Sequence, residues 1–242
     1  MLFGVLFGAA GILAGGVAAV TGFGIGSLLT PLLALRTGTK LAVAAVAIPH
    51  VIGSALRFWK LRLYVDRRVL IGFGSASAVG GLAGALLHTR VSSGALSVVF
   101  GSLLILAAVA ELTGWIQRVQ WGHTAAWVTG ALSGALGGLV GNQGGIRSAA
   151  MLGFDVPKES FVATATAVAL FVDGARLPVY LVTDWHEIAT IWPLVLASTI
   201  GVVIGTAAGT RVLEHLQEAI FRRIVAVLLM TLGVYMIAAG RR

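Results

Sequence analysis

A glycine cluster in the second half of the chain carries the polar groups best suited to bind an anion. The run Gly141-Asn142-Gln143-Gly144-Gly145 interrupts a long apolar segment, and Arg147 follows it. We expect a short helix at Ser148–Leu152 next, and the free N–H groups and dipole at a helix N-terminus favour negative charge. Asn142 and Gln143 add amide donors, and the forked guanidinium of Arg147 fits a planar or tetrahedral oxyanion. The cluster therefore predicts an anion site.

Arg147 is the strongest single indication of this site. A permanent charge inside a membrane is unfavourable, and residues of this kind usually serve a function. Two structural roles remain as alternatives. The long side chain of Arg147 can reach the membrane interface, or it can pair with Asp155 two turns further along the chain.

A second glycine cluster occurs earlier, at Gly22-Phe23-Gly24-Ile25-Gly26. It is less polar, with only the hydroxyls of Ser27 and Thr30 close behind it. A glycine break at membrane depth frees backbone groups that hydrocarbon cannot satisfy, so the break must line a cavity or pack against protein. These hydroxyl and N–H donors are expected to complete the anion cavity from the opposite side. The alternative is that the glycines only allow close helix packing.

Two long apolar segments that follow the clusters carry further candidates. His50, Ser54 and Arg57 are spaced to share one face of a helix. Intramembrane His50 can hydrogen-bond substrate or relay a proton, or it can be a satisfied packing group.

The equivalent segment of the second half presents Thr164, Thr166, Asp173 and Arg176. Asp173 and Arg176 are one turn apart and are expected to neutralise each other as a structural ion pair. A transporter that moves an anion together with protons needs an acid or an imidazole in its pathway. Asp173 and His50 are therefore the proton-coupling candidates. Asp184, His186 and Glu187 lie in the loop that follows and are expected to be solvated.

Several classes of chemistry have no support in the sequence. No carboxylate pair lies inside a helix, no His-x-x-Glu-His spacing occurs, and no nucleophile motif is present. The Gly-x-Gly of the first cluster does not follow a strand, which argues against dinucleotide binding. The chain has no cysteine, so disulfides and thiolate metal sites are excluded. We therefore expect no enzyme activity, no cofactor and no metal site.

The elements that position these residues are membrane-spanning helices. Of the 242 residues, 58% are hydrophobic and 11% are charged, and the mean hydropathy is +0.97, which indicates an all-α integral membrane protein. The first segment lacks a basic start and is expected to be a retained helix, not a signal peptide. About eight segments approach the length that a bilayer requires. They are Leu2–Val20, Leu41–Leu56, Val69–Leu87, Val91–Leu112, Ala125–Val140, Phe161–Val182, Ile188–Ala208 and Ala219–Ala239.

The positive charge is concentrated in short loops. The net charge is +8, and the basic loop from Arg57 to Arg68 is expected to be cytoplasmic by the positive-inside rule. Contact with lipid headgroups explains such a cluster, and nucleic-acid binding is not expected without an aqueous domain.

The chain reads as two copies of one unit. A shift of 119 residues superposes the two glycine clusters and also places Arg176 on Arg57. This agreement predicts two repeats, 1–118 and 119–242, each with a glycine-broken helix and three further helices. The repeats are parallel if the first segment of each crosses fully, and inverted if it folds back. Counting the charges in the loops favours inverted repeats.

With these elements in place, the chain resembles the TauE/SafE family of membrane permeases over essentially its whole length. The resemblance lies in the Gly22–Gly26 cluster followed by Pro31-Leu32-Leu33, the Gly141–Gly145 cluster, and a basic loop before Gly80-Gly81 and Gly84. It implies a multi-pass transporter of sulfite, organosulfonates or related anions in the inner membrane of a bacterium.

The second cluster departs from the family pattern. Asn142 and Gln143 stand where glycine and a small or apolar residue are common, Arg147 replaces an apolar residue, and Ala150 takes the place of a proline. These differences are still compatible with an anion as the substrate. They weaken the assignment of one particular family substrate to this chain.

The residues together favour a secondary transporter for a small sulfur-containing anion, which is bound where the repeats meet. A selective anion channel and a membrane scaffold protein are the alternatives. The expected partners are the anion and the lipid bilayer, while a coupling proton or sodium ion and a homo-oligomer stay open. The residues predicted to bind substrate are Gly22, Gly24, Gly26, Ser27, Thr30, His50, Arg57, Gly141, Asn142, Gln143, Gly144, Gly145, Arg147, Thr164 and Arg176.

Overall fold

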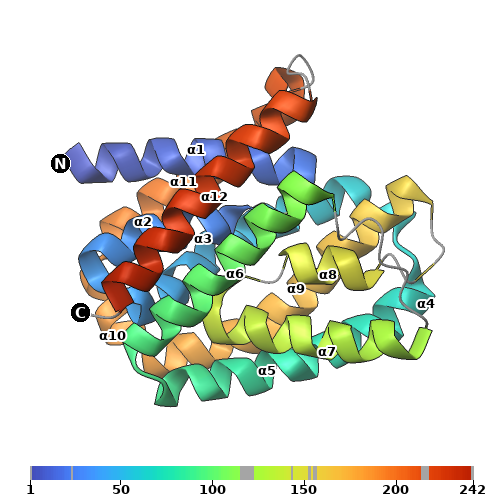
Figure 1. The fold of residues 1–242 in the computed structure, drawn as a ribbon, viewed down its shortest axis with the longest axis horizontal. Helices are drawn as coiled ribbons and strands as arrows, with labels where there is room; N and C mark the ends of the chain where they lie inside the picture. The colour runs from blue at the N-terminus through green and yellow to red at the C-terminus, as the bar shows by residue number, and fades with distance from the viewer. Residues whose placement is uncertain are drawn as a thin grey trace.

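The protein is a bundle of apolar helices, as a computed structural model of the chain shows (Figure 1). The structure describes residues 2–22, 24–114, 123–142, 144–151, 154, 157–213 and 218–240. The helices of the first half are α1 (Leu2–Thr21), α2 (Ile25–Thr37), α3 (Thr39–Leu61), α4 (Arg67–Val69), α5 (Ser75–Arg90) and α6 (Ser93–Thr113), with a 3-10 turn η1 (Arg62–Tyr64) and a π turn η2 (Leu70–Gly74). Those of the second half are α7 (His123–Val140), α8 (Gly144–Met151), α9 (Lys158–Thr183), α10 (Trp185–Thr190), α11 (Trp192–Leu213) and α12 (Glu218–Gly240).

The predicted all-α membrane fold is confirmed, and the eight apolar segments are helical except for Val91, Ser92 and Ile191, which lie between helices. Among the described residues, seven helices are long and apolar enough to cross a bilayer. The eighth predicted segment lies in α7, whose apolar part, Trp127–Val140, is shorter than those seven.

The two broken helix pairs, α1–α2 and α7–α8, are hairpins that open toward opposite ends of α3. Arg36 near the end of α2 stacks on Phe3 near the start of α1, with 4.6 Å from its guanidinium carbon to the ring centroid. In the second pair, the rings of Trp127 and Phe154 are 6.0 Å apart, which brings the start of α7 beside the end of α8. The first hairpin opens where α3 begins. The second opens beside Gly72, beyond the end of α3 (Figure 1).

Each hairpin packs against a helix of the other half. Helix α1 runs along α11, α7 runs along α5, and α3 contacts α9 in the middle. Small residues permit such close approach of helix backbones in a membrane, where lipid offers no hydrophobic driving force. The matched contacts are Gly11 with Ser198, Gly15 with Val202, Gly134 with Ser77 and Gly138 with Gly81.

Candidate functional site

Both glycine clusters interrupt the helical backbone. Helix α1 ends at Thr21 and α2 begins at Ile25, while Gly22 and Gly24 between them have φ of 79° and 129°. In the second half α7 ends at Val140, and Gly141 has φ of 74°. Side-chain-bearing residues rarely adopt these angles, which is why glycine stands there.

The second break is shorter than predicted. Helix α8 begins at Gly144 and not at Ser148, because the two glycines form its first turn. A helix N-terminus tolerates glycine better than a helix interior does. The free N–H groups of α8 therefore belong to Gly144, Gly145 and Ile146.

The two breaks touch each other. A Cβ atom at Gly26 would lie only 2.5 Å from the carbonyl oxygen of Gly141, so only glycine fits this contact. Beside it, the Ser27 hydroxyl donates to the Asn142 side-chain oxygen at 3.2 Å. The breaks, 119 residues apart in sequence, thus form one centre.

A small cavity lies at this contact. It leaves about 10 Å³ for the centres of water-sized molecules, about the room that one water needs. This space is too small for an oxyanion of several non-hydrogen atoms. The residues around it are Gly24, Gly26, Ser27, His50, Gly141, Asn142, Gly144 and Arg147.

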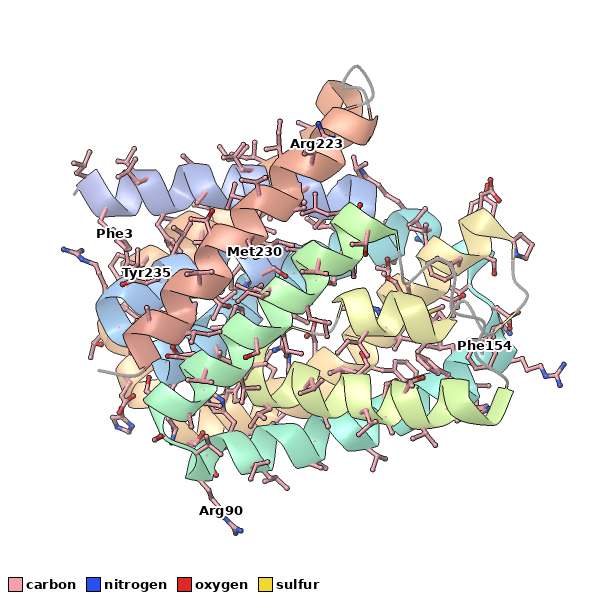
Figure 2. The ribbon with its side chains drawn as sticks, in the orientation of Figure 1. Phe3, Arg90, Phe154, Arg223, Met230 and Tyr235 are labelled. Carbon is pink, nitrogen blue, oxygen red and sulfur yellow. The ribbon has the colours of Figure 1, made fainter. Side chains whose placement is uncertain are left out.

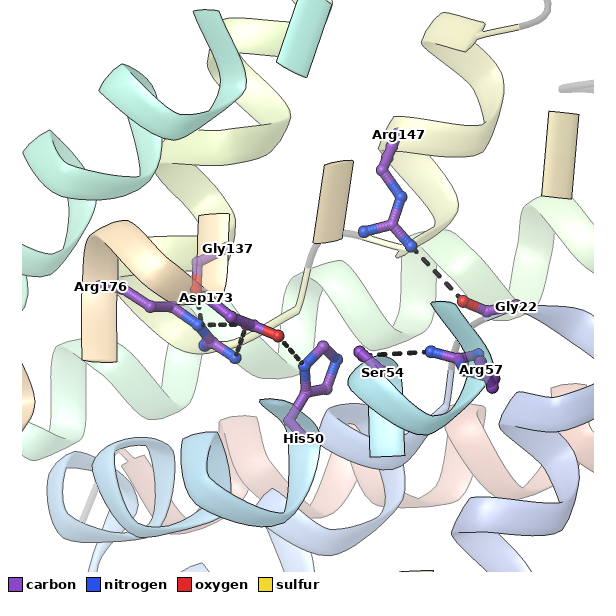
Figure 3. A network of polar contacts seen from close by, with 8 residues as sticks. All are labelled: Gly22, His50, Ser54, Arg57, Gly137, Arg147, Asp173 and Arg176. Atoms are coloured by element: carbon purple, nitrogen blue, oxygen red, sulfur yellow. Dashed lines mark hydrogen bonds and ion pairs between the residues drawn. The ribbon is translucent and has the colours of Figure 1, made fainter. Parts of the chain in front are cut away.

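Arg147 is buried at the cavity wall with part of its hydrogen-bonding capacity unused. Its side chain is 3% exposed, and Nη2 donates to the Gly22 carbonyl across the centre at 3.4 Å (Figure 3). Within the described part of the chain, Nε and Nη1 have no acceptor. The burial argues against the interface alternative, and Asp155 lies outside the described residues. Buried unpaired guanidinium donors are strongly unfavourable and are a ready site for an anion.

Arg57 on α3 and Arg176 on α9 make equivalent contacts with the C-terminal ends of α1 and α7. Nη1 of Arg57 donates to the Ala18 carbonyl, and Nη1 of Arg176 donates to the Gly137 carbonyl at 3.0 Å. Each carbonyl lies four residues before a break glycine. A cation at a helix C-terminus is favourable, so each arginine stabilises the end of a broken helix.

The predicted ion pair of Asp173 and Arg176 is confirmed, with 2.8 Å between Asp173 Oδ1 and Arg176 Nη2. The other carboxylate oxygen, Oδ2, lies 2.8 Å from Nδ1 of His50 on α3 (Figure 3). A carboxylate only accepts hydrogen bonds, so Nδ1 carries a proton and donates it. Nε2 of a neutral His50 is then an unprotonated acceptor, and His50 is one of the residues around the cavity.

The remaining predicted residues lie apart from the cavity or outside the described chain. Thr30 is buried in α2, and the Thr164 hydroxyl accepts the N–H of Asp66 at 2.9 Å. Gly145 lies in the first turn of α8, and Gln143 is not among the described residues. No cluster of metal-ligating side chains occurs in the described ranges.

Sequence reasoning missed the buried polar chain beyond Arg176. The Tyr180 hydroxyl donates to the Gly138 carbonyl, and its ring lies 5.0 Å from that of His88. Asp184 follows on the same face of α9 and is buried, whereas a solvated loop was expected there. The spacing of Asp173, Arg176, Tyr180 and Asp184, three to four residues each, is the signal that would have found them.

Comparison with known proteins gives one match. A model of the family described as sulfite exporter TauE/SafE matches residues 7–236, nearly the whole chain. The matched span contains both breaks and all the buried charged residues described above. No curated protein and no solved structure matches the chain.

Proposed function

The chain belongs to the sulfite exporter TauE/SafE family of membrane transporters, and from this membership we propose that it is a secondary transporter of a small sulfur-containing oxyanion. The anion binds between the two glycine breaks. One observation carries the proposal: buried Arg147 has two donors without an acceptor among the described residues, at a cavity that both breaks line. Sulfite and organosulfonates are the proposed substrates.

The donors at the centre suit an oxyanion. The N–H of Gly144 at the start of α8, the hydroxyl of Ser27, the amide of Asn142 and the guanidinium of Arg147 all belong to residues beside the cavity. Such donors replace the water that a sulfur oxyanion loses when it enters the membrane. Substrate binding must widen the cavity, which holds about one water.

We propose further that the chain consists of two inverted repeats. The oppositely opening hairpins support this interpretation, as do the matched arginine bonds to Ala18 and Gly137. Inverted repeats allow two arrangements of similar energy, in which one unit moves against the other around a fixed site. The anion is then exposed to one side of the membrane at a time. The membrane is proposed to be the cytoplasmic membrane of a bacterium, with the Arg57–Arg68 loop inside.

His50 supplies a coupling proton in this proposal. Asp173 holds Nδ1–H, so Nε2 can donate a hydrogen bond to a bound anion only when His50 is protonated. Anion binding then takes up one proton. The charged groups around His50 are Asp173 and Arg176 on α9, Arg57 on α3 and Arg147 on α8.

The experiment that tests the site is anion binding by the purified full chain. Calorimetry with sulfite and with methanesulfonate should show saturable binding that is lost in Arg147→Ala and in Asn142→Leu. Exposed Arg90, which points away from the bundle in Figure 2, gives the matched control Arg90→Ala, which should bind as wild type. Wild-type protein that binds none of these anions contradicts the proposal.

Flux measurements separate a transporter from the alternatives. A transporter in vesicles should show saturation and counterflow, since the cavity must open to each side in turn. Unsaturable electrogenic flux would instead favour a channel. A scaffold protein would show no anion flux, and Arg147→Ala would alter complex formation only.

A further inference from the structure

The centre of the bundle holds more buried positive charge than negative charge. Arg57, Arg147 and Arg176 are 6%, 3% and 2% exposed, and Asp173 is fully buried. Asp173 neutralises Arg176 on α9 at 2.8 Å. Within the described ranges, neither Arg57 nor Arg147 has a carboxylate at ion-pair distance. Two guanidinium charges therefore remain while His50 is neutral.

Backbone dipoles do not balance these two charges. Arg57 and Arg147 donate to the carbonyls of Ala18 and Gly22, which lie four residues apart at the C-terminal end of α1. A helix end of this sign offers roughly half a negative charge. The N-terminal ends of α2 and α8 meet at the same centre and offset the C-terminal ends of α1 and α7. The net charge at this centre is therefore set by the side chains and not by the helix dipoles.

The two guanidiniums lie close together. Arg57 donates to the Ala18 carbonyl, which also accepts the N–H of Gly22 at 3.0 Å, and Arg147 donates to the carbonyl of that same Gly22. Buried like charges that bond to the same end of one helix repel each other in the low dielectric of a protein interior. Nε of Arg57, together with Nε and Nη1 of Arg147, also lacks an acceptor in the described chain. Counted over the described residues, both observations leave two guanidinium charges for a bound anion to balance.

We propose that this site selects doubly charged oxyanions and that Arg57 and Arg147 are the residues that set this charge. The inference rests on the proposed function, because it names the charge class of the anion bound between the breaks. A sulfur dianion neutralises both guanidiniums, whereas a monoanionic sulfonate leaves one of them unpaired.

The second half of the chain shows what the equivalent arginine looks like when it has a counter-ion. Ser54 lies 119 residues before Asp173, at the place that matches it, and its hydroxyl accepts from Arg57 Nη2 at 3.2 Å. Arg176 thus has a carboxylate where Arg57 has only a hydroxyl. Ser54→Asp should give Arg57 its own counter-ion and lower the charge that the site requires of its ligand.

Calorimetry on the purified full chain tests the proposal with sulfate and methanesulfonate. These anions are nearly the same size and differ by one charge, and neither titrates near neutral pH. At constant ionic strength, wild type should bind sulfate about tenfold or more tighter than methanesulfonate, since one extra buried charge interaction is worth at least that factor. Ser54→Asp should remove this preference by weakening sulfate, while the uncharged variant of equal size, Ser54→Asn, should keep it.

Equal binding of the two anions by wild type, or tighter binding of methanesulfonate, overturns the proposal. So does an equal loss of the preference in Ser54→Asp and Ser54→Asn, because size and not charge would then be the cause. If Ser54→Asp does not fold, the wild-type ratio and its collapse in Arg57→Gln decide the question. Binding of both anions without a preference leaves the proposed function standing, whereas binding of neither removes both.

Discussion

Arg57 and Arg176, 119 residues apart in sequence, make the same contact in the two halves of the molecule. Each donates through Nη1 to the carbonyl four residues before a break glycine. Their partners on the same helix differ, because Arg176 meets the carboxylate of Asp173 and Arg57 meets the hydroxyl of Ser54. One broken helix is therefore fixed by a neutral network and the other by an uncompensated charge.

Loss of the carboxylate at Asp173 should destabilise the protein severely. Asp173→Asn leaves buried Arg176 without a counter-ion, and its single amide oxygen cannot replace both the oxygen that faces Arg176 and the one that faces His50 Nδ1–H. We expect a loss of about 3–5 kcal/mol in the free energy of unfolding, as for other broken buried ion pairs. Thermal unfolding in detergent measures the loss, with exposed Glu187→Gln on α10 as the control that should unfold as wild type. Equal stability of both variants would show that the network is not structural.

The contact between the breaks should not tolerate a methyl group. Gly26→Ala places Cβ against the Gly141 carbonyl and must separate the two hairpins, so anion binding should be lost. At exposed Gly174 in α9, an added methyl group would meet no atom of another helix within 4 Å, which makes Gly174→Ala the matched control. That variant should keep full binding and gain about 0.5–1 kcal/mol in helix stability. Binding by Gly26→Ala at wild-type affinity would exclude the contact from the site.

Much of the fold follows from the sequence, because a bilayer constrains segment length and composition. Runs such as Leu2–Val20 and Phe161–Val182 are apolar over the width of a membrane, and both correspond to helices. The helix breaks at Gly22 and Gly141 were predictable too, because clustered glycines favour a break in a helix. Both residues have a positive φ, which an α-helix does not contain. Helix length and helix breaks depend on residues that are close together in the sequence, so the sequence alone can predict them.

Contacts across the bundle were not predictable in the same way. The pairing of His50 with Asp173 depends on how α3 and α9 are rotated against each other, which the sequence of neither helix specifies. The start of α8 was placed too late because its first two glycines were counted in the break. Asp184 was expected in solvent because its burial comes from packing beyond the end of α9.

The inverted arrangement predicts on which side of the membrane two exposed residues lie. Leu63 is 87% exposed beyond the end of α3, and Val182 is 85% exposed near the end of α9. Helix α9 starts beside the end of α3, as the bond between Asp66 and Thr164 shows, so the two residues should face opposite sides. The chain has no cysteine, so Leu63→Cys and Val182→Cys each create a single label site. An impermeant thiol reagent on intact cells should modify Val182→Cys only, and permeabilised cells should show both labelled. Labelling of both variants in intact cells would contradict this topology.

Anion affinity should rise as the pH falls. Nε2 of neutral His50 has no proton to donate, so binding takes up one proton, and such linkage changes the affinity by up to about tenfold per pH unit. Sulfate is the suitable ligand for calorimetry because its own charge is constant over the neutral range, whereas sulfite titrates there. His50→Gln keeps a donor without a titrating group, so its affinity should not change with pH. A wild-type affinity that is equally flat would remove His50 from the coupling role and leave the anion site itself in place.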